Sequence, residues 1–216
     1  MKPGFVIAVD GPAASGKGTL AGRLAEHYRL PFLDTGLLYR AVALDLLARG
    51  VDLDDAEAAE AAARGLDAAR LDPAALSGRA AGEAASRVAA RPRVRLALLQ
   101  LQRDFAAQPT GAVLDGRDIG TVIAPGAQAK IFVTARPEVR AERRWRQLKA
   151  VGETLTLEDM VEDIRRRDAR DAGRTAAPLL QADDAVLLDT SEMDISEVVD
   201  AARRIVEAAR ARWNRS

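Results

Sequence analysis

Nine consecutive residues near the start of the chain have the types and order needed to hold phosphate: Gly11, Pro12, Ala13, Ala14, Ser15, Gly16, Lys17, Gly18 and Thr19. Glycines leave room for successive backbone N–H groups to converge on one point, and a helix that begins there adds its positive dipole end. Lys17 would place a mobile charge on the outer phosphates of a nucleoside triphosphate. We therefore predict that this loop binds ATP.

The segments on either side of the loop support this interpretation. An apolar run over residues 5–9 precedes it and helical periodicity starts near Lys17, which gives the strand–loop–helix order that a phosphate-binding loop requires. A flexible connection between a strand and a helix is the alternative. Gly18 displaces the hydroxyl of Thr19 by one position from its usual place after the lysine, so we expect no direct protein ligand for Mg²⁺. The metal that accompanies ATP should rest on phosphate oxygens, water and a nearby carboxylate.

A second charged group, Asp115-Gly116-Arg117-Asp118, follows the apolar residues 112–114. A carboxylate at the end of a buried strand is unfavourable unless it meets a cation or a metal. Asp115 would face the phosphate loop and could hold Mg²⁺ through water. Arg117 and Asp118 would project from the same edge of the sheet. An Arg–Asp pair that only stabilises a turn is the alternative.

A third charged group lies on one predicted helix, where Arg167, Arg170, Asp171 and Arg174 fall at positions i, i+3, i+4 and i+7. This spacing places the four side chains on one helix face. A solvated charged face is the alternative explanation. The single histidine, His27, lies in the first predicted helix, away from the loop, and we expect it to have no catalytic role.

Composition limits the classes of function. The 216 residues contain 48% hydrophobic residues, no cysteine, and equal numbers of basic and acidic residues, 32 of each. This balance disfavours a nucleic-acid partner, which usually selects a basic excess. Because no leader, membrane-length apolar run or thiol is present, we expect a cytoplasmic protein without disulfides or a membrane partner, and we expect a monomer.

The pattern of apolar runs predicts an α/β fold. Strand-length runs cover residues 5–9, 30–33, 112–114, 130–133 and 185–188, and helical stretches cover 18–28, 36–48, 92–107, 137–150, 157–172 and 195–213. The strands do not alternate between apolar and polar residues, so both faces should be buried, as in a parallel five-stranded sheet with helices on both faces. Residues 51–90 carry no convincing strand. Ligands of such folds bind at the carboxyl ends of the strands.

Taken together, the motifs resemble those of the bacterial cytidylate kinase (CMP kinase) family. They run from about residue 6 to 188 and comprise the phosphate loop, Leu33-Asp34-Thr35-Gly36 with Tyr39-Arg40, Ala85-Ser86-Arg87-Val88-Ala89-Ala90 with Arg93-Val94-Arg95, Asp115-Gly116-Arg117-Asp118, and Arg167-Asp168-Ala169-Arg170-Asp171 with Arg174. The phosphate loop alone is common to many kinases. The Asp-Gly-Arg-Asp stretch and the segment around Ser86 are more selective.

The resemblance implies transfer of the γ-phosphoryl group of ATP to CMP or dCMP, giving ADP and CDP or dCDP, in pyrimidine nucleotide metabolism. It implies one domain of the P-loop NTPase type over residues 1–216, with a core of about 1–40, 91–150 and 175–216. A monophosphate-binding insertion would cover about 41–90, and a short lid about 151–174. Family members usually have a longer insertion with small strands, whereas residues 66–83 here carry no strand signal.

The resemblance also suggests a role for each polar residue. Lys17, Arg117, Arg170 and Arg174 would be catalytic, with Arg144 as a further lid arginine near the transferred group. The substrate-binding residues would be Thr35, Arg40, Ser86, Arg95, Arg117, Asp118, Arg167, Asp171 and Arg174. Arginine forks suit the acceptor phosphate, and Arg167 with Asp171 resembles the ribose contacts. Cytosine has an exocyclic amino donor where uracil has a carbonyl, so a carboxylate such as Asp118 favours cytosine.

Two other functions remain compatible with the residues. The first is a kinase of the same architecture for adenylate, shikimate or dephospho-coenzyme A, acceptors that do not require Ser86, Arg95 and the Asp115–Asp118 stretch. The second is a nucleotide-dependent switch that hydrolyses slowly, which would need neither a lid arginine cluster nor an acceptor pocket.

Overall fold

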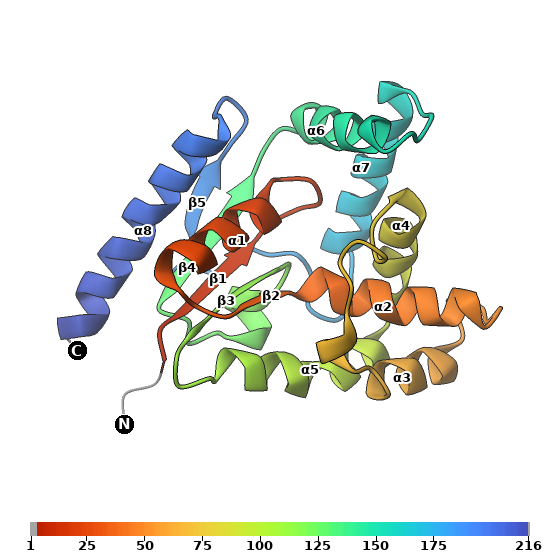
Figure 1. Cartoon of the computed structure of the whole chain (residues 1–216), viewed down its shortest axis with the longest axis horizontal. Helices are drawn as coiled ribbons and strands as arrows, with labels where there is room; N and C mark the ends of the chain where they lie inside the picture. Colours follow the sequence, from red (N-terminus) through yellow and green to blue (C-terminus); the bar gives the residue numbers. More distant parts are fainter. Residues whose placement is uncertain (1–3, 216) are drawn as a thin grey trace.

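The protein is described by a computed structural model over residues 4–215, which contains a parallel sheet flanked by helices (Figure 1). Its five strands follow the order β2-β3-β1-β4-β5. They are β1 (Val6–Asp10), β2 (Phe32–Asp34), β3 (Ala112–Gly116), β4 (Ala129–Thr134) and β5 (Val186–Asp189). All pairings between neighbouring strands are parallel, with Val9 opposite Asp115 and opposite Ile131. This confirms the predicted α/β fold.

The central strands are buried on both faces because helices cover the sheet from both sides. Ile7 and Val9 of β1 point toward a cluster with α1 (Lys17–Tyr28) and α8 (Ile195–Arg215). Val6 and Ala8 point toward the opposite cluster, which contains α5 (Pro92–Ala106) and the π-helical turn η2 (Ile119–Ile123). Because successive side chains of a strand point to opposite faces of the sheet, each of these residues contributes to one of the two cores.

Burial on both faces does not extend to the outer strands, contrary to the expectation for β2 and β5. Val186 and Leu187 of β5 are exposed, and so is Phe32 of β2. A strand at the edge of a sheet has a neighbour on one side only, and the covering helices do not reach past it. The apolar run alone could not distinguish these edge strands from the central ones.

The six predicted helices are present with nearly the predicted ends. They are α1, α2 (Thr35–Ala48), α5, α6 (Pro137–Ala150), α7 (Leu157–Ala172) and α8. Pro92 and Pro137 stand in the first turns of α5 and α6, where a missing N–H is tolerated. Asp34 starts α2 by accepting a hydrogen bond from Gly36 N at 2.8 Å.

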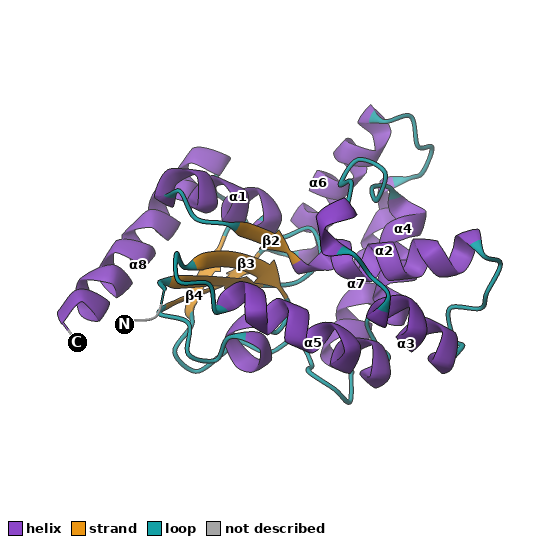
Figure 2. Cartoon of the chain, turned by 60° about the horizontal axis from the view of Figure 1, so that its bottom comes forward, coloured by secondary structure: helices purple, strands orange, loops and turns teal. Residues whose placement is uncertain are grey.

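Residues 51–90 contain no strand and form a helical lobe. The lobe consists of α3 (Ala56–Arg64), the short 3₁₀ turn η1 (Ala68–Arg70) and α4 (Arg79–Val88). Its apolar side chains share one core with α2 and the start of α5, through Leu38, Val42 and Leu98 among others. Figure 2 shows α2, α3 and α4 grouped beside the sheet. Alanine-rich helices pack closely here because their side chains are small.

The predicted lid helix α7 packs against α6 rather than standing alone. Ala141 and Leu148 of α6 form a cluster with Met160 and Ile164 of α7, and Ala13 of the phosphate loop belongs to the same cluster. The division into core, insertion and lid stays a prediction. No helix within residues 4–215 has the length and apolar content needed to cross a membrane.

Candidate active site

One cavity of about 710 Å³ opens at the carboxyl ends of the strands. Its lining combines the phosphate loop after β1, the ends of β2 and β3, and residues of α2, α4, α5 and α7. The predicted site residues that line it are Ala14, Ser15, Gly16, Lys17, Gly18, Thr19, Thr35, Arg40, Ser86, Arg95, Arg117, Asp118, Arg167, Asp171 and Arg174. The structure therefore brings together residues from five separate motifs of the sequence.

The first residues of the phosphate loop do not reach the cavity. Gly11, Pro12 and Ala13 are buried and absent from the lining. A Cβ on Gly11 would lie 2.0 Å from the carbonyl oxygen of Val133, so this glycine allows the loop to cross the end of β4. Gly16, with φ of +86°, then turns the chain into α1. Contact of these three residues with ATP stays a prediction, and in this structure they lie behind the loop residues that line the cavity.

Lys17 has no hydrogen-bond or salt-bridge partner for its ammonium group among the described residues. Burial and the nearby charge of Arg117 lower the pKa of Lys17 to about 8, although Asp115 and Asp34 oppose this shift. Burial and the charge of Asp34 raise the pKa of Asp115 to about 8, against the opposing effect of Lys17. The lysine is thus an unpaired cation that faces a partly protonated carboxyl group.

Gly18, the departure from the usual motif, lies against Asp115. A Cβ at position 18 would lie 3.2 Å from Asp115 Oδ2, so a serine or threonine there would press on the carboxylate. Asp115 Oδ1 and Ser15 Oγ are both buried and have no hydrogen-bond partner in the described residues. Thr35 Oγ1 donates to the carbonyl oxygen of Asp115 at 2.8 Å and so offers only its lone pairs to the cavity.

Three arginines that line the cavity lack a carboxylate partner, Arg40, Arg143 and Arg167, although most arginines of the described chain form ion pairs. Arg144, which is outside the lining, also has none among the described residues. Their neutral contacts include a bond from Arg40 to Leu76 O at 2.9 Å and one from Arg144 to Gly78 O at 3.1 Å. Burial, with the charge of Arg117, lowers the pKa of Arg167 to about 10, and burial also lowers the pKa of Arg40 and Arg144.

The unpaired arginines converge where α4 leaves room for them. A Cβ on Gly82 of α4 would lie 3.5 Å from Arg167 Nη1 and 3.9 Å from Arg40 Nη2. The two guanidinium groups therefore approach the same point of the helix. Clustered half-buried cations without counter-charges are unfavourable in the free protein, and an anion bound between them would remove this penalty.

Arg117 and Arg174, in contrast, share one carboxylate. Arg117 Nε donates to Asp171 Oδ2 at 2.9 Å, and Arg174 Nη2 donates to Asp171 Oδ1 at 2.5 Å. Burial would raise the pKa of Asp171, but the two guanidinium groups hold it below its usual value. Both oxygens of Asp171 are thus engaged, and the aspartate aligns two forks that line the cavity.

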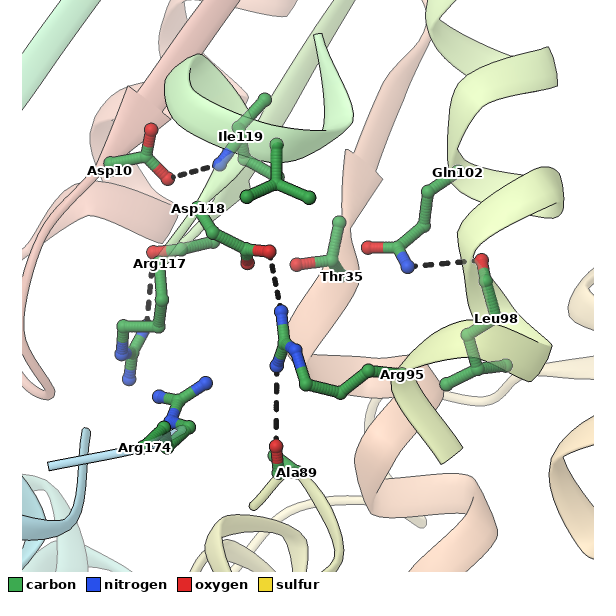
Figure 3. A network of polar contacts seen from close by, with 12 residues as sticks. Asp10, Thr35, Ala89, Arg95, Leu98, Gln102, Arg117, Asp118, Ile119 and Arg174 are labelled. Atoms are coloured by element: carbon green, nitrogen blue, oxygen red, sulfur yellow. Dashed lines mark hydrogen bonds and ion pairs between the residues drawn. The ribbon is translucent and has the colours of Figure 1, made fainter. Parts of the chain in front are cut away.

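A buried ion pair between Arg95 and Asp118 lies on another wall of the cavity (Figure 3). Arg95 also donates to Ala89 O at 3.3 Å and lies over the ring of Tyr39, 5.5 Å from its centre. Asp118 therefore presents its second oxygen next to a fixed guanidinium donor. One acceptor and one donor side by side suit the polar edge of a planar base.

Asp10 anchors the loop that carries this pair, and the sequence analysis did not identify it. Its carboxylate accepts hydrogen bonds from Ile119 N at 2.8 Å and Gly120 N at 2.7 Å, at the start of η2 (Figure 3). Burial raises the pKa of Asp10 to about 6. An acidic residue directly before Gly11, at the end of the first strand, was the available signal for it.

Arg140 is a second residue that sequence reasoning missed. It donates to Ala13 O at 3.1 Å in the phosphate loop and forms a two-pronged pair with Asp168 of α7, at 3.0 and 2.6 Å. Arg140 is also bonded to Ala135 O at 2.8 Å and is buried. One side chain thus connects the loop, α6 and α7. Nothing in the sequence distinguishes it from neighbouring arginines such as Arg143.

Arg170 does not line the cavity. Its Nη1 donates to Ser86 Oγ at 2.7 Å and its Nη2 pairs with Glu83 Oε1 at 2.7 Å, so the guanidinium faces α4. The catalytic role predicted for it stays a prediction without support from this placement. His27, near the carboxyl end of α1, packs its ring against Tyr28 and is absent from the lining.

The far end of the cavity is formed by residues that the sequence did not single out. Arg143 donates to Thr190 O at 2.6 Å and to Thr190 Oγ1 at 3.0 Å, which joins α6 to the loop after β5. The other lining residues there are Arg146, Gln147, Met193, Asp194, Ile195 and Val198. An apolar floor with a polar rim is typical of a pocket for a flat organic group.

Comparisons with known proteins agree with this site. The profile of the cytidylate kinase family matches residues 7–208. A cytidylate kinase of Caulobacter vibrioides is 68% identical over 209 residues, with 97% of this chain and 98% of the relative covered. A cytidylate kinase of Xanthobacter autotrophicus is 66% identical over 207 residues, covering 96% and 99%.

Solved structures with low sequence identity share the fold. A gluconokinase from Sinorhizobium meliloti superposes with a TM-score of 0.54 at 18% identity, covering 100% of this chain and 99% of its own. A shikimate kinase from Bacteroides thetaiotaomicron gives a TM-score of 0.51 at 13% identity, covering 94% and 97%. These likenesses concern the fold alone. With a family profile that matches nearly its whole length, the chain belongs to the cytidylate kinase family.

Proposed function

We propose that the protein transfers the γ-phosphoryl group of ATP to CMP or dCMP, releasing ADP and CDP or dCDP. The observation that carries this proposal is a single cavity with two anion-binding ends. The unpaired Lys17 lies on the phosphate loop at one end, and the unpaired Arg40 and Arg167 lie at the other. An enzyme that joins two phosphorylated substrates needs two such positions facing one another.

The reaction needs positioning and charge neutralisation more than proton transfer. A phosphate oxygen of the acceptor attacks the γ-phosphorus, and the bond to the β,γ-bridging oxygen breaks as ADP leaves. Because that acceptor oxygen is already anionic near neutral pH, no general base is required, and the chain offers only His27 outside the cavity. Lys17 and the loop amides stabilise charge on the donor. Arg117 and Arg174, aligned by Asp171, bind the acceptor phosphate or the moving group.

Mg²⁺ fits the donor end as a partner of the ATP phosphates. Asp115 Oδ1 is buried and unpartnered next to Lys17, and it is suited to accept hydrogen bonds from metal-bound water. Within residues 4–215 no group of three or more His, Cys, Asp or Glu side chains is arranged to hold a metal. The ion would therefore be held mostly by phosphate oxygens, and it would neutralise the charge of the triphosphate.

The sugar and the base would be bound by the walls between the two ends. Arg167 and Asp171 lie on the face of α7 that lines the cavity, where they would contact ribose hydroxyls. Asp118 would accept from the exocyclic amino group of cytosine, with Arg95 as a donor to the ring. Uracil would present a carbonyl oxygen to the same carboxylate, so buried groups would stay unpaired.

A coupled assay of ADP release tests the proposal directly. ATP with Mg²⁺ is offered with CMP, dCMP, UMP or AMP in turn, and we expect fast turnover with the two cytosine nucleotides and slow turnover with UMP. Turnover with AMP alone would point to another kinase of this architecture. ADP release that is slow and independent of any acceptor would point to a nucleotide-dependent switch.

The base-reading role of Asp118 has its own test. We expect Asp118→Ala to lower the ratio of kcat/KM for CMP over UMP by about 10- to 100-fold, because the acceptor for the amino group is lost. The Kd of ATP should stay within about threefold of wild type, since the donor end is untouched. An unchanged CMP-to-UMP ratio would remove Asp118 from base recognition.

A monomer in the cytoplasm completes the proposal. The lack of cysteine suits a reducing compartment, where ATP and nucleoside monophosphates are available. Light scattering of the purified protein tests the oligomeric state.

A further inference from the structure

Arg170 lies outside the cavity lining, but it contacts Ser86, which belongs to the lining. From α7 its Nη1 donates to Ser86 Oγ on α4 at 2.7 Å, while its Nη2 is held by Glu83 Oε1, one helical turn before Ser86, at 2.7 Å. Ser86 is buried and belongs to the cavity lining. The hydroxyl of Ser86 is therefore connected to Arg170 on one side and to the cavity on the other.

This contact occupies one of the two lone pairs of Ser86 Oγ and so limits the directions in which its hydroxyl can donate. A guanidinium group only donates hydrogen bonds, so Ser86 Oγ must accept from Arg170 and its own hydrogen must point elsewhere. No acceptor for that hydrogen exists among residues 4–215, because the only bond formed by Ser86 Oγ is the one from Arg170. Ser86 thus enters the cavity as a hydrogen-bond donor.

We propose that Arg170 is a positioning residue for base choice, which holds Ser86 as a donor toward N3 of the acceptor base. The proposal rests on the function given above. Cytosine N3 is a lone-pair acceptor and receives the hydroxyl proton, whereas uracil carries a hydrogen on N3 and presents a donor to a donor. When the wrong base binds, a buried polar group of the site stays unpaired, and the site therefore rejects that base strongly. Ser86 would then donate to N3 of cytosine, and Asp118 would accept from the neighbouring exocyclic amino group.

The pair with Glu83 explains why a long side chain can hold this direction. The guanidinium bridges Ser86 and Glu83 on the same face of α4 through one N–H of each terminal nitrogen, so the plane of the fork is set. The hydrogen bond from Arg170 lowers the pKa of Glu83, although partial burial opposes this, so the carboxylate stays charged at neutral pH. A freely rotating serine would instead serve either base.

The experiment measures kcat and KM for CMP and for UMP at saturating ATP in a double-mutant cycle. The variants are Arg170→Met, Ser86→Ala and the two combined, with Arg170→Lys as the conservative replacement. Arg165→Met is the matched control, because Arg165 is an exposed residue of α7 paired with Glu138. Thermal melting followed by circular dichroism checks that each variant is folded.

If Arg170 acts through Ser86, Arg170→Met lowers the ratio of kcat/KM for CMP over UMP by about 10-fold or more, mainly by raising KM for CMP. Ser86→Ala lowers the ratio to a similar extent, and adding Arg170→Met to it changes the ratio by less than about twofold. Arg170→Lys recovers part of the ratio because an ammonium group also only donates, and Arg165→Met leaves it unchanged.

Three results would overturn the inference. One is a loss of kcat with both acceptors at an unchanged ratio, which would make Arg170 a catalytic residue at the transferred group. Another is a full additive effect of Arg170→Met in the Ser86→Ala background. If Arg170→Met does not fold, the inference is overturned when both Ser86→Ala and Arg170→Lys leave the ratio of kcat/KM for CMP over UMP unchanged. A wild-type protein without CMP-dependent ADP release would instead reject the proposed function itself.

Discussion

The two ends of the cavity hold anions by different means. The donor end is made from consecutive small residues whose backbone N–H groups and helix dipole supply the positive field, with Lys17 as the added charge. The acceptor end is made from long side chains on α2, α5 and α7 and just after β3, far apart in the sequence. The difference shows that local backbone geometry can bind polyphosphate, whereas a compact monophosphate requires charges gathered by the tertiary fold.

The two ends also differ in the state of their charges without a ligand. Arg117 and Arg174 share the single negative charge of Asp171, while Arg40 and Arg167 have lowered pKa values and no carboxylate. Lys17 is unpaired but faces Asp115 and Asp34 across the loop. At the acceptor end, a bound phosphate would remove the repulsion between the unpaired arginines, and this relief favours binding. At the donor end, binding depends on a loop geometry that is already formed.

Removing the charge of the donor end should have the largest effect. Lys17→Ala should lower kcat by about 10³-fold, because the charge that stabilises the γ-phosphoryl group in transit is lost. The Kd of CMP measured by calorimetry should stay within about threefold of wild type. Lys149→Ala is the control, since Lys149 is exposed beside Trp145. An unaltered kcat in Lys17→Ala would contradict the assignment.

Removing one unpaired arginine should damage the acceptor end alone. Arg167→Met should raise KM for CMP by about 10- to 100-fold and leave KM for ATP nearly unchanged. The same change should stabilise the ligand-free protein by about 1 kcal/mol, because a buried cation without a partner is removed. Melting temperatures with and without CMP measure both effects, with Arg165→Met as the control. A less stable free protein would show that Arg167 is not under electrostatic strain.

The donor end should also respond to pH. Lys17 and Asp115 interact and both have pKa values shifted to about 8, so the pair loses protons in coupled steps as the pH rises through that range. Each proton lost makes the site one charge more negative, and kcat/KM for ATP should fall by about tenfold or more per pH unit above 8. Rates between pH 6 and 10 test this. The decline should move to higher pH in Lys17→Arg, and a profile that is flat to pH 9.5 would contradict the shift.

The smallest effect is expected at Gly18. Gly18→Ala should slow turnover by about threefold to tenfold, because the new Cβ presses on Asp115 Oδ2. It should also raise the free energy of unfolding by about 0.5 to 1 kcal/mol through higher helix propensity. Gly22→Ala is the control in the same helix, since its Cβ would meet only the Phe32 ring at 3.9 Å. Equal turnover in both variants would show that the contact with Asp115 is unimportant.

The parts of the molecule that the sequence predicted well are those determined by local order. The boundaries of α6 and α7 follow from proline, capping residues and periodicity, and the phosphate loop is a continuous motif. The edge positions of β2 and β5 depend on which strands lie beside them, which a single apolar run does not encode. The same limit applies to Gly11, whose role is set by the carbonyl of Val133 more than a hundred residues away.

The roles of the arginines were the least predictable feature. In an arginine-rich chain Arg140, Arg167 and Arg170 look alike, yet one ties two elements together, one is unpaired and one faces Ser86. The difference depends on carboxylates brought near by folding. Helical spacing identified the face of α7 correctly for Arg167 and Asp171, and it failed for Arg170, which lies at the border of that face. Arg174 lines the cavity from just beyond the end of α7.

The bridge made by Arg140 has a mechanical consequence. Because this one guanidinium group donates to the carbonyl of Ala13 and to the carboxylate of Asp168, it couples the position of the phosphate loop to that of α7. A tilt of α7 would therefore displace the phosphate loop. A compound wedged beneath α7 would therefore weaken nucleotide binding at a distance and behave as a competitor of ATP without overlapping it.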